Sequence, residues 1–157
     1  MKLTLEETLK FSDFIAYVFL TIKEGLFLWI FSILIIKFFK GKSSDIVVIK
    51  NDKKIIGGFC LTDFPVVKYS PYNLFNKKVR RKIDELVKNG YQHFCFFVVK
   101  KQFRNMGVGT FAFDSYLKKN HKRIWFVSYP KAENFYLRNG AKLFYKSRYN
   151  IYVLNIY

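Results

Sequence analysis

Acidic residues are scarce in this chain, because 11 Asp and Glu stand against 28 Lys and Arg and give a formal net charge of +17. An excess of this size repels itself in the folded state and attracts polyanions, phosphorylated ligands or an anionic membrane surface. A lysine-rich surface that meets only water would give the same count. The charge therefore identifies no partner by itself.

Cysteine is almost absent. Cys60 and Cys95 are the two cysteines of the chain, and each lies inside an apolar run. Neither belongs to a C-x-x-C motif or to a cluster with histidine, which argues against a disulfide framework and against a zinc site. We therefore expect a reducing, cytoplasmic setting and no metal.

A continuous apolar run long enough to span a membrane is also missing. Residues 14–22 and 26–39 are strongly apolar, but residues 23–25 separate them. The second run is uninterrupted for only about 11 residues, where a spanning helix needs about 20. Glu6 and Glu7 do not fit the positive start of a cleavable signal. Three interpretations remain, namely a buried helix pair, an interfacial helix anchored by the lysines that follow, or a signal anchor. Contact with a membrane or a partner is favoured over a purely buried pair.

The order of sequence patterns is typical of an α/β domain with a mixed sheet. Thr4 and Glu7 have the spacing of a capping box, which predicts that a helix begins there. The expected elements are helices over 4–24 and 26–41, a β-hairpin over 45–50 and 54–61, a helix over 76–89, a strand over 94–99, a helix over 107–119, a strand over 124–127, a helix over 130–139, and strands over 142–146 and 150–154. No repeat or linker divides the chain. We expect one domain, with apolar helices in residues 1–41 and the sheet and ligand site in residues 45–157.

Residues 99–110 have the features of an anion-binding loop. A buried strand runs into a turn, Gly107 and Gly109 are separated by one residue, and a helix begins there. Glycine lets the backbone approach a ligand closely, and the amides at a helix N-terminus attract a negative group. Positive charge is added by Lys100, Lys101 and Arg104. The expected ligand is a diphosphate. A dinucleotide-binding domain does not fit, because the βαβ half before the motif and the acidic ribose ligand are missing.

Two stretches resemble motifs of the GNAT N-acetyltransferase superfamily. Gln102–Gly109 looks like the [QR]-x-x-G-x-[GA] motif that follows the family's fourth strand, and Ala132–Ala141 resembles the A-x-x-[LF]-Y-x-x-x-G-[FA] segment. The resemblance implies a GNAT-like acyl-CoA N-acyltransferase fold, acetyl-CoA or another acyl-CoA as cofactor, and transfer of an acetyl group to an amine. Two features depart from the family. No first strand is evident before the apolar helix pair, and a basic helical insert within residues 62–92 lengthens the connection between strands 3 and 4.

The resemblance also implies roles for single residues. Backbone amides of the loop would bind the diphosphate, and main-chain groups of Phe97 and Val99 would pair with the pantetheine arm of CoA like an added strand. Tyr136 aligns with the tyrosine that family members use as a general acid towards the CoA sulfur. Tyr129 stands where the family usually has Asn, so that contact is expected to differ. The expected cofactor-binding residues are Phe97, Val99, Gln102, Phe103, Arg104, Asn105, Met106, Gly107, Val108, Gly109, Thr110 and Tyr129.

The general base is harder to identify. Many members of the GNAT superfamily place a glutamate on the fourth strand, and the expected fourth strand of this chain carries none. Strand alternation places His93 on the same face as Cys95, Phe97 and Val99. An imidazole can accept a proton near neutral pH, so His93 is the candidate base. A water chain, or an amine that is already neutral when bound, would serve as well, and His93 would then be a solvated residue at a strand edge.

The acceptor stays open, and three interpretations compete. The basic helix and the cluster at residues 118–123 suit an acidic protein or a tRNA, which favours acetylation of an amine on a protein, a peptide, an aminoacyl-tRNA or a small molecule. The second is an acyltransferase that uses a longer acyl donor at the inner face of the membrane, with the apolar helices on lipid. The third is a non-catalytic binding protein with a GNAT-like fold. A homodimer formed through exposed apolar residues would also fit.

Overall fold

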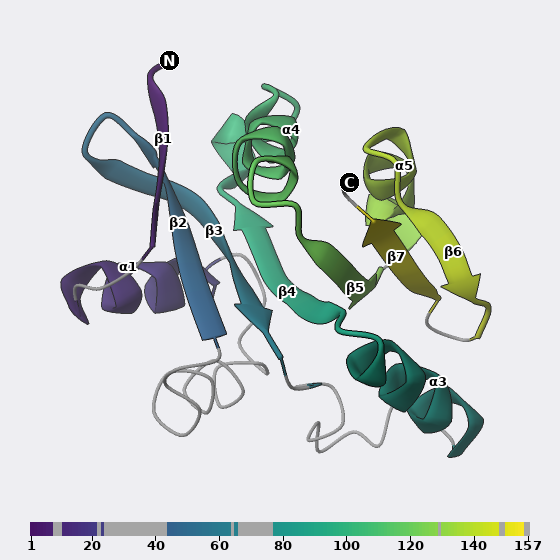
Figure 1. Cartoon of the computed structure of the whole chain (residues 1–157). Helices are drawn as coiled ribbons and strands as arrows, with labels where there is room; N and C mark the ends of the chain where they lie inside the picture. Colours follow the sequence, from purple (N-terminus) through teal and green to yellow (C-terminus); the bar gives the residue numbers. More distant parts are fainter. Residues whose placement is uncertain are drawn as a thin grey trace.

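A seven-stranded mixed sheet organises the computed structural model of the chain (Figure 1). The structure describes residues 1–7, 11–21, 23, 44–63, 65, 77–128, 130–147 and 150–155. The strand order is β1-β2-β3-β4-β5-β7-β6. Neighbouring strands are antiparallel except for β4 and β5, which are parallel. The mixed sheet confirms the fold class that the sequence predicts.

The helices and strands follow the predicted order from residue 44 onward. In chain order they are β1 (Leu3–Glu7), α1 (Phe11–Thr21), β2 (Ser44–Asn51), β3 (Lys54–Thr62), α3 (Lys77–Lys88), β4 (Gln92–Val99), η4 (Lys101–Phe103), α4 (Val108–Ala112), η5 (Phe113–Lys118), β5 (Arg123–Val127), α5 (Pro130–Arg138), β6 (Lys142–Tyr145) and β7 (Ile151–Asn155). α4 and η5 follow each other without a break, so they act as one helix. The insert between β3 and β4 contains α3, as expected.

The N-terminus differs from the prediction. Residues 3–7 form β1, and the helix begins only at Phe11. β1 pairs with β2 in a register that runs from Leu3 opposite Asn51 to Glu7 opposite Val47. The predicted helical start at residue 4 and the predicted lack of a first strand are therefore wrong. The physical reason is the alternation of apolar and polar residues from 3 to 6, which lets one face of an edge strand pack on the core while the ladder satisfies the backbone.

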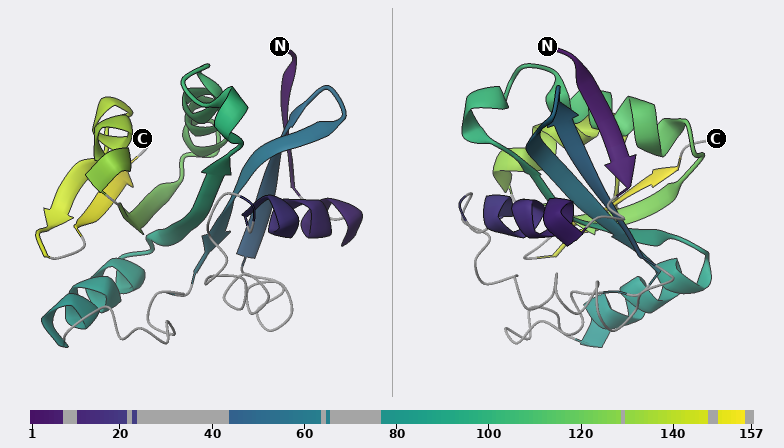
Figure 2. Two further views of the ribbon diagram at one scale, coloured as in Figure 1. Left: turned by 180° about the vertical axis from the view of Figure 1, so that it is seen from behind. Right: turned by 90° about the vertical axis from the view of Figure 1, so that its left-hand side faces the viewer.

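The helices cover both faces of the sheet, and Figure 2 shows them from two further sides. Successive residues of β5 face opposite sides of the sheet. Ile124 and Phe126 join the cluster under α4, η5 and α5, whereas Trp125 joins the cluster under α3. On the face of Trp125, α1 packs against a third cluster that contains Val48 and Cys60. The core therefore consists of two layers with the sheet between them.

The insert helix α3 is strongly amphipathic. Val79, Ile83 and Leu86 are buried at helical spacing, while the other positions carry mostly charge. No helix within the described ranges is long and apolar enough to cross a membrane. The second predicted apolar helix, over 26–41, lies outside the described residues.

Candidate active site

The loop between β4 and α4 begins with a tight turn at η4 (Lys101–Phe103), ahead of its two glycines. The Phe103 amide donates to the Lys100 carbonyl at 2.8 Å and the Arg104 amide donates to the Lys101 carbonyl at 3.2 Å. Asn105 then takes a positive φ of 63°. Because a helix begins at residue 108, the amides of its first turn have no acceptor within the helix. They form a natural site for an anion.

The two glycines of the loop are needed for different reasons. Gly107 has a φ of 77°, and a Cβ added there would meet no atom within 4 Å. A Cβ added at Gly109 would lie 2.8 Å from Cζ of Phe135 and 3.4 Å from Cζ of Phe97. Gly107 therefore supplies the backbone conformation, and Gly109 lets the start of α4 lie directly on α5 and β4.

The side chains of the loop divide into anchors and exposed groups. Val108 is buried, and Phe103 packs half-buried against the core. The exposed members of the predicted set are Gln102, Arg104, Asn105, Met106, Gly107 and Thr110. The backbone and the nearby positive charge are therefore what the loop offers to a ligand. Tyr129 lies outside the described residues.

β4 and β5 separate after only two residue pairs, Gln92 with Ile124 and His93 with Trp125. β4 continues beside β3 as far as Val99 opposite Gly57. The register with β3 shifts along the way, and Phe96 takes a φ of 55°, so one extra residue forms a bulge in β4. A bulge bends its strand and increases the local twist, which accounts for the opening beside β5.

Beyond the bulge, the main-chain groups of β4 point alternately towards β3 and towards this opening. The Lys100 amide donates to the Ile56 carbonyl of β3 at 2.8 Å. Since consecutive residues of a strand direct their main-chain groups to opposite neighbours, those of Phe97 and Val99 point towards the opening. The Val99 carbonyl accepts a hydrogen bond from Nε of Arg104 at 2.9 Å. This arrangement fits the strand-like pairing predicted for a pantetheine arm.

Tyr136 lies on α5 among the aromatic rings of the core cluster under α4, η5 and α5. Its ring centroid is 4.3 Å from that of Phe126 and 5.9 Å from that of Phe113. Phe135, its neighbour, stacks on Phe97 of β4 with 5.9 Å between the centroids. Burial raises the pKa of Tyr136 above its ordinary value, so the phenol keeps its proton at neutral pH. The role of Phe135 as a wall against Gly109 was not expected from the sequence.

His93 lies on the face of β4 opposite Phe97 and Val99. Its ring is stacked on Trp125 at 4.2 Å and is 2% exposed, whereas Phe97 and Val99 pack in the cluster under α4. The predicted shared face is wrong, because the extra residue at Phe96 breaks the alternation on which it rested. Burial lowers the pKa of His93 to about 3, so the imidazole is neutral at pH 7.

The buried imidazole should make the fold sensitive to acid. The pKa is about 6.5 in an unfolded chain and about 3 in the folded chain, so the unfolded state binds the proton more tightly. The free energy of unfolding should therefore fall as the pH drops from about 6.5 towards 3, by up to about 1.4 kcal/mol per pH unit. Denaturant unfolding at pH 7 and pH 5 measures this slope. The free energy of unfolding of the His93→Leu variant should depend less steeply on pH. Equal slopes in the variant and the wild type would contradict the lowered pKa of His93.

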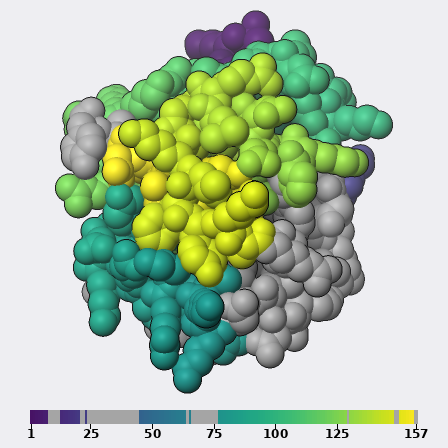
Figure 3. All heavy atoms as spheres, turned by 90° about the vertical axis from the view of Figure 1, so that its right-hand side faces the viewer, coloured from purple at the N-terminus to yellow at the C-terminus, as the bar shows by residue number. Residues whose placement is uncertain are grey.

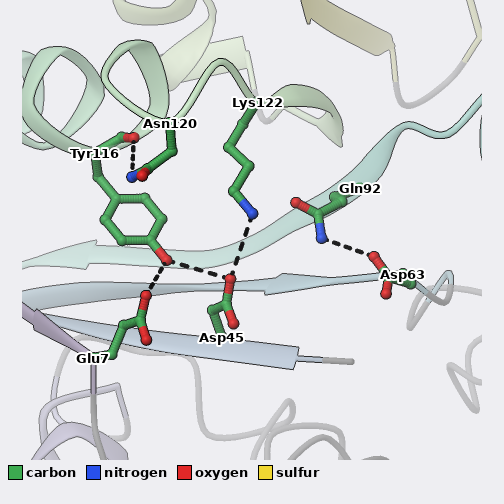
Figure 4. A network of polar contacts seen from close by, with 7 residues as sticks. All are labelled: Glu7, Asp45, Asp63, Gln92, Tyr116, Asn120 and Lys122. Carbon is green, nitrogen blue, oxygen red and sulfur yellow. Dashed lines mark hydrogen bonds and ion pairs between the residues drawn. The ribbon is translucent and has the colours of Figure 1, made fainter. Parts of the chain in front are cut away.

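A polar network joins the N-terminal strands to η5, and no local sequence pattern indicates it (Figure 4). The Tyr116 hydroxyl donates to Oε1 of Glu7 at 2.9 Å and lies 3.3 Å from Oδ2 of Asp45. Nζ of Lys122 is 3.7 Å from the same Asp45 oxygen. Burial and the two carboxylates raise the pKa of Tyr116, so its hydroxyl stays a donor. The network fixes β1 and β2 against the helix that begins at the loop.

The comparisons with known proteins find matches among solved structures. No protein-family model matches the chain, and the search of curated proteins finds no match. FeeM, an N-acyl amino acid synthase from uncultured soil microbes, has a similar structure with 12% identity and a TM-score of 0.70, over 99% of this chain and 90% of FeeM. An acetyltransferase of the GNAT family from Staphylococcus aureus has 14% identity and a TM-score of 0.66, over 99% and 100%. The PaiA N-acetyltransferase from Thermoplasma acidophilum, in complex with coenzyme A, has 11% identity and a TM-score of 0.64, over 99% of both chains. The chain therefore has the fold of the GNAT acetyltransferases.

Proposed function

We propose that the protein is an N-acyltransferase that binds acetyl-CoA or another acyl-CoA and transfers its acyl group to an amine. One observation carries the proposal: the anion-binding loop stands at the end of β4, directly beside the opening between β4 and β5. A ligand with a diphosphate and an extended amide-bearing arm matches that pair of features. The relative from Thermoplasma acidophilum was solved with coenzyme A, a molecule of this kind.

The groups of the chain divide the chemistry between them. The loop holds the diphosphate, and the main chain of Phe97 aligns the arm in the opening. Attack of the amine nitrogen on the thioester carbonyl forms the amide bond and breaks the bond between carbon and sulfur. The Tyr136 hydroxyl donates its proton to the leaving sulfur, and the proton that the nitrogen loses as the amide forms returns to the phenolate oxygen, directly or through water. Burial raises the pKa of the phenol, so the hydroxyl carries its proton at neutral pH and can donate it.

The base role of His93 stays a prediction, and its position works against it. A pKa of about 3 makes the buried imidazole a weak base at neutral pH. Its ring also lies on the other face of β4 from Phe97. An amine that binds in its neutral form needs no protein base before it attacks, and it fits this site better.

Release of the CoA thiol tests the proposed activity. Acetyl-CoA is incubated with the protein and a panel of primary amines that includes aminoacyl-tRNA, and free thiol is followed with a chromogenic disulfide. We expect release above the rate without protein for at least one amine. Repeating the assay with palmitoyl-CoA tests the longer donor. A protein that binds acyl-CoA but releases no thiol with any amine would be a binding protein rather than an enzyme.

A polyanion is the acceptor class that the surface favours. The exposed positions of α3 carry Lys77, Lys78, Arg80, Arg81, Glu85 and Lys88. The first turn of α3 contains no acidic residue. Acidic groups stabilise the start of a helix and cations destabilise it, so the basic residues of this turn weaken the helix. Figure 3 shows side chains of α3 projecting beside β6. The exposed positions hold no apolar residue, which suits RNA better than insertion into lipid.

Charge reversal on α3 should weaken RNA binding and leave acyl-CoA binding intact. For Lys78→Glu combined with Arg81→Glu we expect at least tenfold weaker binding of bulk tRNA, because each phosphate contact contributes to affinity through ion release. Fluorescence anisotropy at 50 and 200 mM salt measures the affinity and its salt slope. Lys2→Glu combined with Lys131→Glu changes the net charge equally away from α3. Equal losses in the two double variants would show that overall charge, and not α3, binds the RNA.

Membrane association, a longer acyl donor and a homodimer stay predictions. They depend on the apolar helices predicted within residues 11–39, of which only 11–21 and 23 belong to the described residues. Flotation of the full chain with anionic vesicles tests the first, the palmitoyl-CoA assay tests the second, and sedimentation tests the third.

A further inference from the structure

The bulge in β4 leaves one backbone carbonyl outside the regular ladder. Phe96 has a φ of 55°, which lies in the left-handed region that a side chain other than glycine adopts at a cost. Such a conformation turns the peptide group of Phe96 away from the two neighbouring strands. A carbonyl that is partly buried in this position needs a donor, because an unsatisfied polar group destabilises the fold.

Tyr17 of α1 supplies that donor. Its side chain is fully buried, and its hydroxyl donates to the Phe96 carbonyl at 2.6 Å. Because the only proton of the phenol is used in this bond, the Cys60 thiol, 3.7 Å away, is the donor to the phenol oxygen. Burial raises the pKa of Tyr17, so its hydroxyl keeps the proton at physiological pH.

The ring of Tyr17 packs closely against β3. A Cβ added at Gly58 of β3 would lie 2.7 Å from Cε2 of Tyr17, so the ring rests directly on the backbone of the neighbouring strand. A phenylalanine would fill the same space. The hydroxyl is therefore the part of Tyr17 that the bulge requires.

The bulge controls which way Phe97 faces. Removing the extra residue from the register would move Phe97 to the opposite face of the sheet, because side chains alternate along a strand. In the structure its ring stacks on Phe135 with 5.9 Å between the centroids, and it stands beneath Gly109. The bulge thus connects α1 on one face of the sheet to the loop and the opening on the other.

We propose that Tyr17 is a positioning residue for acyl transfer, whose hydroxyl holds the Phe96 carbonyl and so fixes the bulge that presents the main chain of Phe97 to the acyl-CoA. Tyr17 does not touch the substrate and acts only through the backbone of β4. The inference rests on the proposed function, because it assigns Tyr17 to the same acyl-CoA site.

Two ligands separate a positioning role from a merely structural one. ADP has the diphosphate of CoA but no pantetheine arm, so it reports on the loop alone, whereas acetyl-CoA reports on the loop and the opening. For Tyr17→Phe we expect ADP affinity within about twofold of wild type and acetyl-CoA affinity lowered about tenfold. A general loosening of the fold would weaken both ligands equally, and that result would overturn the inference. Calorimetric titration, with each ligand at matched protein concentration, measures both.

Two further variants keep the test decisive. Cys60→Ala removes the other partner of the phenol and leaves the bond to Phe96, so its ratio of the two affinities should match wild type. Replacing Tyr17 with 4-aminophenylalanine restores an N–H donor and should restore acetyl-CoA affinity; a persistent selective loss would overturn the role of the hydrogen bond. If wild type binds neither ligand, the proposed function fails, and the inference fails with it. If wild type binds both ligands and Tyr17→Phe binds each of them with the wild-type affinity, only the inference fails.

Discussion

Gly109→Leu should abolish measurable binding of acetyl-CoA. A Cβ at residue 109 would lie 2.8 Å from the Phe135 ring, and that ring is held between Phe97 and Phe113. The start of α4 must then move, and its amides move with it. We expect at least a hundredfold loss of affinity, about 2.7 kcal/mol or more. Calorimetric titration measures the affinity, and thermal unfolding shows whether the variant is folded.

A matched pair of glycines, one inside the loop and one outside it, separates the effect of the loop on acetyl-CoA binding from the effect of backbone strain alone. Gly107 and Gly90 have φ values of 77° and 75°, and a Cβ would meet nothing within 4 Å at either residue. Alanine at either position should lower the free energy of unfolding by roughly 1 kcal/mol, from backbone strain alone. Gly107→Ala should also weaken acetyl-CoA binding about tenfold, and Gly90→Ala should not. Unchanged binding in Gly109→Leu, or equal binding losses in the two alanine variants, would mean that the loop does not hold the diphosphate.

Tyr136→Phe should lower the rate of acyl transfer about a hundredfold while acetyl-CoA affinity changes less than about twofold, because general acid catalysis contributes 10² or more. Burial raises the pKa of this phenol, so the wild-type rate should not fall on the alkaline side until the pH passes the ordinary value of about 10. The measurement is thiol release as a function of pH, with the acceptor found in the amine screen.

Tyr152 provides the matched control for Tyr136. Its ring stacks on Phe126, with 5.8 Å between the centroids, and its hydroxyl donates to Glu133. Tyr152→Phe should lower stability through the lost hydrogen bond and leave the rate unchanged. A Tyr136→Phe variant that keeps more than half of the wild-type rate would rule out the general-acid role.

The parts of the site that were predicted are those whose chemistry is local. The strand, the two glycines and the helix start of residues 99–110 lie within one short stretch, so their residue types alone indicated an anion site. The segment from Ala132 to Ala141 likewise placed Tyr136 on a helix. Both stretches have the predicted secondary structure.

The parts that were missed depend on partners far along the chain. Residues 3–7 have a helix-start pattern, but pairing with β2 makes them a strand. His93 shared a face with Phe97 by simple alternation until the bulge intervened, and the bulge depends on Tyr17, which lies 79 residues away from Phe96. Propensity and periodicity do not carry such contacts, because they describe only the nearest neighbours in sequence.

Calorimetric titration of the wild-type protein with acetyl-CoA tests the central claim most directly. We expect one site per chain with a dissociation constant in the range of about 1 µM to 1 mM, and competition by ADP for the same site. Binding that ADP weakens would place the diphosphate on the protein as proposed. No heat and no competition at millimolar acetyl-CoA would contradict the account, and would leave a GNAT fold without the acyl-CoA site that its loop predicts.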